Sequence, residues 1–67
     1  MSIHKVIEVI SQSDKSWEDA AQRAVVDAAR TLKGIKTIYI KDIQGIVEGD
    51  RIVRYRVNAQ ITFEVGE

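Results

Sequence analysis

Cysteine and proline are both absent from this 67-residue chain, which contains one tryptophan and one histidine. Without cysteine, the chain can form no disulfide bridge and no thiolate metal site, and it has no cysteine nucleophile. His4 has neither a second histidine nor a nearby pair of acidic residues with which to hold a metal ion. No glycine-rich phosphate loop follows a strand-like segment. The sequence therefore predicts a protein that is not an enzyme and has no metal site.

Long apolar runs and an excess of one charge are also missing. No stretch of about 18 apolar residues occurs, and no apolar N-terminal segment precedes a small-residue cleavage site. Ten basic and ten acidic residues give a formal net charge of +0, so no overall field attracts nucleic acid or an anionic membrane. We expect a cytoplasmic protein with neither a nucleic-acid nor a membrane partner.

The small size of the chain predicts self-association. A chain of this length buries roughly 3,900 Å² of apolar surface on folding, which at about 25 cal/mol/Å² contributes roughly 100 kcal/mol. Ordering its residues at about 1.5 kcal/mol each costs nearly the same. Because no disulfide can supply the missing margin, a homo-oligomer is the expected source of stability.

Hydrophobic periodicity divides a single domain, residues 1–67, into four elements. Ile3–Ile10 is rich in β-branched residues, which is typical of a strand. Trp17–Lys33 carries apolar residues at helical spacing, with Ser16 as the predicted N-cap and Gly34 as the predicted C-terminal stop.

Two strands are predicted after the helix. Ile35–Glu48 contains Gly45, which indicates a bulge, and Arg51–Val65 follows after a tight turn at Gly49. The order β-α-β-β predicts an α+β fold in which a three-stranded antiparallel sheet, with the third strand in the middle, curls over one helix.

The last strand has two distinct faces. Its apolar residues alternate with polar ones, so a period of two places them on opposite sides of the sheet. One side is the core, and the other, here named the polar face, carries Arg54, Arg56, Asn58, Gln60, Thr62 and Glu64. On the preceding strand, alternation places Ile38 and Ile40 in the core, with Ile46 as a further candidate, and assigns to the polar face Thr37, Tyr39, Lys41 and Ile43.

The complete pattern resembles the dodecin family over essentially the whole chain. The residues that carry the resemblance are Lys5–Ile10, Ser16–Ala21, Ile43–Gly45, Tyr55–Val57 and Ile61–Phe63. The resemblance implies a hollow homododecamer that binds flavins in stacked pairs and stores or sequesters them. Its implied cofactor is FMN or riboflavin.

The resemblance also implies an altered flavin site. In flavin-binding dodecins a tryptophan near the start of the second strand stacks on the isoalloxazine ring, and a glutamine on the third strand bonds to it. The matching positions here are Thr37 and Arg56. Threonine has no π face, and arginine donates hydrogen bonds but cannot accept them. We therefore expect weakened or lost flavin affinity; the alternative is a flavin-independent structural cage that binds ions or a phosphate-bearing small molecule.

The candidate ligand-binding residues are thus Thr37, Tyr39, Arg54 and Arg56. Tyr39 can stack on a planar ligand or serve as an amphipathic tyrosine in a subunit contact. Arg54 and Arg56 can bind an anion or phosphate, or pair with acidic residues across a subunit contact. Trp17 lies on the apolar stripe of the helix, so we interpret it as a core or subunit-contact anchor.

Overall fold

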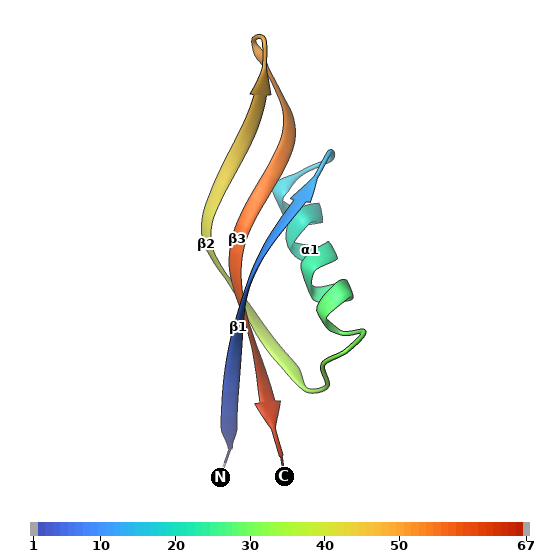
Figure 1. Cartoon of the computed structure of the whole chain (residues 1–67), viewed down its shortest axis with the longest axis vertical. Helices are drawn as coiled ribbons and strands as arrows, with labels where there is room; N and C mark the ends of the chain where they lie inside the picture. The colour runs from blue at the N-terminus through green and yellow to red at the C-terminus, as the bar shows by residue number, and fades with distance from the viewer. Residues whose placement is uncertain (1, 67) are drawn as a thin grey trace.

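The computed structural model describes residues 2–66 and contains one helix and one sheet. Its elements are β1 (Ile3–Ser13), α1 (Trp17–Ala28), β2 (Ile35–Glu48) and β3 (Arg51–Val65). All pairings are antiparallel, and the strand order β1-β3-β2 places β3 in the centre (Figure 1). The predicted fold class and strand order are confirmed.

The core lies between α1 and the central strand. Ala20, Ala24 and Ala28 are buried on the helix, and they face buried β3 residues, of which Val57 and Ile61 are the largest. Alanine side chains allow the helix to approach the sheet closely, which brings the two layers into contact in so short a chain. Figure 1 shows the β2–β3 hairpin extending past the start of α1.

The helix is shorter than its sequence pattern predicts. It ends at Ala28 rather than Lys33, and the amide of Leu32 still donates to the carbonyl of Ala28 at 2.9 Å. Leu32 packs against the core cluster of Ala24, Ala28 and Ile61. Leu32 therefore lies on the apolar side that the helical spacing predicts, although it belongs to the turn after α1 and not to the helix.

Gly34 belongs to the connection that leads into β2, not to the helix terminus. Its φ angle is 79°, a left-handed value that favours glycine. The Gly34 carbonyl accepts a hydrogen bond from the Glu64 amide at 2.9 Å. A Cβ atom at Gly34 would lie 2.8 Å from the Glu64 carbonyl oxygen. The glycine thus allows the connection to approach the backbone of β3.

β1 continues three residues beyond the predicted end at Ile10. The added residues remain in register with β3, and the last of them, Ser13, pairs with Tyr55. Ser13 is 5% exposed, and its hydroxyl accepts from the Lys15 amide at 2.9 Å while donating to Asp19 at 2.5 Å. These bonds allow a polar strand end to be buried beside the helix N-terminus.

The predicted faces of β2 are wrong near its middle. Gly45 is in register with Tyr55, whereas the register shifts occur between residues 35 and 37, 40 and 42, and 46 and 47. The shift at Lys41 inserts one residue and moves the following side chains to the opposite faces. Ile43 therefore pairs with buried Val57 on the helix side, and Ile46 pairs with Arg54 on the polar face.

The subunit is elongated and exposes more surface than a compact chain of its size. It measures 51 × 20 × 13 Å with a radius of gyration of 13.7 Å, against about 11 Å for a compact domain of this length. Its accessible surface is 5011 Å², where about 4,300 Å² is typical. The excess surface favours association with further copies.

Candidate functional site

The polar face consists of rows that run across the three strands. In each row a β3 residue lies between one partner from β1 and one from β2, with side chains on the same side of the sheet. The rows are Gln12–Arg56–Gln44, Ile10–Asn58–Asp42, Glu8–Gln60–Tyr39 and Val6–Thr62–Thr37.

Apolar side chains on this face come from the edge strands. The centre, on β3, is polar, whereas the edge strands add, between their polar residues, the exposed apolar residues Val6 and Ile10 from β1 and the exposed ring of Tyr39 from β2. The face therefore combines a hydrogen-bonding strip with flanks that are partly apolar. Such a surface suits a flat molecule that has apolar faces and a polar edge.

The candidate residues are spread along this face rather than gathered at one point. Thr37 is in register with Thr62, and Arg56 lies six residues earlier on β3, which corresponds to about 20 Å at 3.3 Å per residue. One subunit does not bring Thr37 and Arg56 together, so a site that uses both requires a second copy. Tyr39, by contrast, is only two residues from Thr37 and lies on the same face.

An ion pair crosses the polar face beside Tyr39. Lys41 Nζ donates to Glu8 Oε2 at 2.6 Å, which joins the two edge strands over β3. The hydrogen bond from Lys41 and then its charge lower the pKa of Glu8, and the neighbouring Gln60 amide adds a smaller effect in the same direction. The same bond to Glu8 raises the pKa of Lys41. Both groups are therefore charged at neutral pH, and the pair reduces the net charge beside Tyr39.

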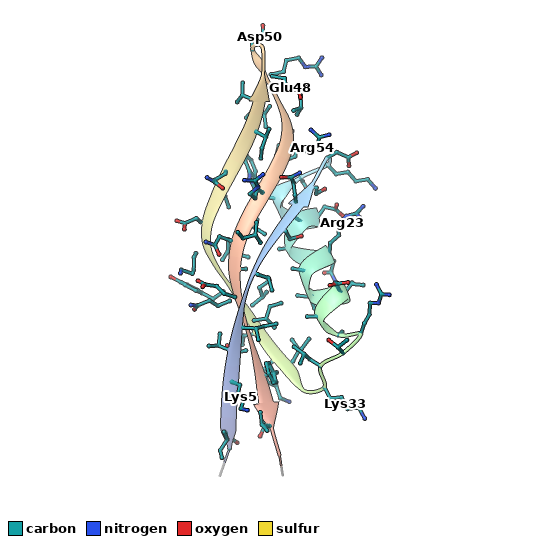
Figure 2. All side chains as sticks on the ribbon, in the orientation of Figure 1. Lys5, Arg23, Lys33, Glu48, Asp50 and Arg54 are labelled. Atoms are coloured by element: carbon teal, nitrogen blue, oxygen red, sulfur yellow. The ribbon has the colours of Figure 1, made fainter. Side chains whose placement is uncertain are left out.

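The two candidate arginines have different surroundings. Arg56 donates from Nε and Nη2 to Gln12 Oε1, at 3.0 and 2.8 Å, so a neutral amide rather than an acidic partner holds its guanidinium. Arg54 is exposed and borders a shallow hollow of about 320 Å³ with Gln12 and Arg23. Figure 2 labels Arg54 beside the tip of β1 and Arg23 beside α1. Arg54 is thus the more accessible of the two for an anion.

Trp17 lies on the helix side, away from the polar face. Its Nε1 donates to the Gln44 carbonyl at 2.9 Å, and its ring meets Tyr55 edge-on with centroids 4.9 Å apart. These contacts join the start of α1 to both β2 and β3. They agree with the interpretation of Trp17 as an anchor rather than a ligand stacker.

The start of α1 contains a second polar cluster. Ser16 caps the helix as predicted, because its hydroxyl accepts from the Asp19 amide at 2.9 Å. The Asp19 carboxylate accepts from Ser13 and, at 2.7 Å, from Arg23. Hydrogen bonds from Ser13 and then Arg23 lower the pKa of Asp19. These hydrogen bonds join the end of β1 to the first turn of α1.

Two types of site are not seen within the described chain. Residues 2–66 contain no group of three or more histidine, cysteine, aspartate or glutamate side chains placed to hold a metal ion. In the same range, no helix is both long and apolar enough to cross a membrane.

The sequence comparison decides the family. The Dodecin family model matches residues 3–66, which is nearly the whole chain. The chain belongs to the dodecin family. The calcium dodecin of Mycobacterium tuberculosis is 31% identical over 65 residues, which cover 97% of this chain and 92% of the relative. The dodecin of Thermus thermophilus is 26% identical over 65 residues, with 97% and 94% covered.

Solved dodecin structures have the same architecture. A tryptophan-to-phenylalanine variant of the Thermus thermophilus dodecin superposes with a TM-score of 0.93 at 25% identity, covering 100% of both chains. The calcium dodecin of Mycobacterium tuberculosis, described as having a novel calcium-binding site, gives a TM-score of 0.83 at 29% identity, covering 97% and 93%. The predicted family resemblance is confirmed.

Sequence reasoning did not select Glu8, Lys41 or Gln60 as candidate site residues. Alternation places Gln60 on the polar face, but only the register shows that it lies directly between Glu8 and Tyr39. No local pattern predicts the Lys41–Glu8 bond, because the two residues are 33 positions apart in the chain.

Proposed function

We propose that the chain is a small-ligand binding and storage protein that acts as a closed homo-oligomer of twelve subunits. The observation that carries the proposal is the polar face, an open sheet surface with a hydrogen-bonding centre and one exposed aromatic ring. Membership of the dodecin family and the excess surface of the isolated subunit support the assembly.

The ligand proposed is a flavin, bound more weakly than by a dodecin with a stacking tryptophan. Thr37 offers no aromatic surface at the matching position, and the guanidinium of Arg56 is already bonded to Gln12. The lost stacking alone removes about 0.5–1.5 kcal/mol beyond the contact area of the ring.

A fluorescence titration tests this proposal. Riboflavin and FMN are titrated with the assembled protein while flavin emission is followed, and light scattering measures the mass of the assembly. Saturable quenching by an assembly of about twelve subunits is the expected result. A stable monomer would contradict the closed oligomer, and unchanged emission at millimolar protein would contradict flavin storage.

A flavin-independent cage that binds ions is the second candidate. Similarity to the Mycobacterium tuberculosis calcium dodecin favours it. Ca²⁺ takes six to eight oxygen ligands, and one copy of residues 2–66 presents no cluster of three acidic groups. A calcium site would therefore combine carboxylates from several subunits. Calorimetric titration with Ca²⁺ tests this: heat of binding with no flavin quenching would select the cage, and no heat would exclude calcium.

A further inference from the structure

We propose that Tyr39 and Gln60 form the ligand-recognition pair on the polar face, with Tyr39 as the stacking surface and Gln60 as the hydrogen-bonding amide. The inference rests on the proposed function and names the residues that carry it out. Neither residue occupies the positions that the resemblance assigns to these two roles.

The pair lies in a single cross-strand row. Tyr39 and Gln60 are direct partners in the β2–β3 register, which puts their Cβ atoms about 4.5–5.5 Å apart. Tyr39 is 63% exposed, whereas Gln60 is half-buried between the edge strands. One subunit thus supplies an accessible ring beside an amide, in contrast to Thr37 and Arg56, which are six β3 positions apart.

Gln60 lies beside a charged neighbour. Glu8 is its direct partner in the β1–β3 register, and a carboxylate only accepts, so an N–H of the Gln60 amide is the group suited to face Glu8. Glu8 is itself held by Lys41 at 2.6 Å. Within residues 2–66, no side chain or backbone group is found donating to the Gln60 side-chain carbonyl. That oxygen is therefore available to accept a hydrogen bond from a ligand.

These positions define the chemical class of the ligand. A planar heteroaromatic ring can lie against Tyr39 while an N–H at its edge donates to the Gln60 carbonyl. An imide or lactam edge on a fused ring, as in the isoalloxazine of a flavin, meets both requirements. A saturated or purely anionic ligand meets neither, since it has no π face and no N–H donor.

The test compares variants by FMN titration. Tyr39→Leu removes the π face, Tyr39→Phe retains it, Gln60→Leu removes the amide, and Gln22→Ala, on the exposed side of α1, is the control away from the polar face. We expect Tyr39→Leu and Gln60→Leu each to weaken binding by about 3- to 10-fold. Tyr39→Phe should lose far less affinity than Tyr39→Leu, and Gln22→Ala should bind as the parent does.

The possible outcomes separate this inference from the proposed function. If the parent binds FMN and Tyr39→Leu binds equally well, the recognition pair is wrong and flavin binding stands. If the parent does not quench FMN at all, flavin storage fails and this inference fails with it. Light scattering is run on each variant: a change in assembled mass with Tyr39→Leu would identify Tyr39 as a subunit contact and overturn the proposal.

Discussion

Replacement of Gly34 by alanine measures how closely the connection after α1 must approach the central strand. Gly34 has a φ angle of 79°, and a non-glycine residue in that region costs about 1–2 kcal/mol. The new Cβ would lie 2.8 Å from the Glu64 carbonyl oxygen, a backbone atom that cannot rotate away. Relief of the clash must lengthen the 2.9 Å bond from the Glu64 amide to the Gly34 carbonyl. That bond contributes about 0.5–1.5 kcal/mol, so we expect a total loss of about 2–3 kcal/mol.

Gly49 provides the matched control. Its φ angle is also positive, at 67°, but a Cβ there would meet nothing within 4 Å. Gly49→Ala should therefore cost only the backbone contribution of about 1–2 kcal/mol. Urea unfolding followed by Trp17 fluorescence measures both variants at one fixed protein concentration, because the stability of an oligomer depends on concentration. Equal losses for the two variants would refute the close approach at Gly34.

Three further predictions concern the helix start and the polar face. The pKa of Asp19 is lowered in the folded protein, so its contribution to folding stability is present above its ordinary pKa of 3.8 and is lost as the pH falls below that value. Asp19→Asn should therefore make the decline of Tm between pH 5 and pH 2 less steep. An unchanged slope of Tm against pH would contradict this. Trp17→Phe removes the bond to Gln44 and should cost about 0.5–1.5 kcal/mol in urea unfolding while FMN affinity stays unchanged; lost affinity would make Trp17 a ligand residue. The double variant Thr37→Trp/Arg56→Gln should tighten FMN binding by more than about tenfold, about 1.4 kcal/mol. If the titration shows no gain in affinity, neither position belongs to the flavin site.

The single variants of the last pair add information on the assembly. Thr37 and Arg56 are about 20 Å apart in one subunit, so their effects are additive unless the same ligand contacts both from different copies. A double variant that gains more than the sum of the single ones would show that a second copy completes the site.

Sequence periodicity predicted the fold because each main element has one dominant local signal. The alanine stripe and the Ser16 cap define the start and the buried face of α1, and strict alternation along β3 separates Val57, Ala59 and Ile61 from the polar face. These signals depend on side chains close together in the chain, so they survive without knowledge of the tertiary contacts.

The errors arose where tertiary contacts override local pattern. Leu32 continues the helical period although the helix has ended, because it packs on the same core after a turn. Ile43 changes face because the register shift at Lys41 adds one residue, and an extra residue reverses every later side chain until another shift occurs. A lysine does not indicate a bulge, so the shift at Lys41 could not be predicted from its residue type. Gly45, where the sequence predicted a bulge, instead leaves room for the Ile52 side chain, whose Cγ2 would lie 3.2 Å from a Cβ atom at that position.

The strand register also determines which side chains of the polar face lie together to contact a ligand. By chain position alone, Tyr39 is an exposed aromatic and Gln60 one of several polar residues on β3. Their pairing places a ring and an amide in one row, and the Lys41–Glu8 ion pair beside them leaves little net charge to attract an anion. Tyr39, Val6 and Ile10 remain exposed at 63%, 54% and 68%. Exposed apolar groups on both flanks of a hydrogen-bonding strip gain free energy when a flat apolar surface covers them. The same side chains that leave an isolated subunit incompletely buried are therefore the ones that favour a planar ligand.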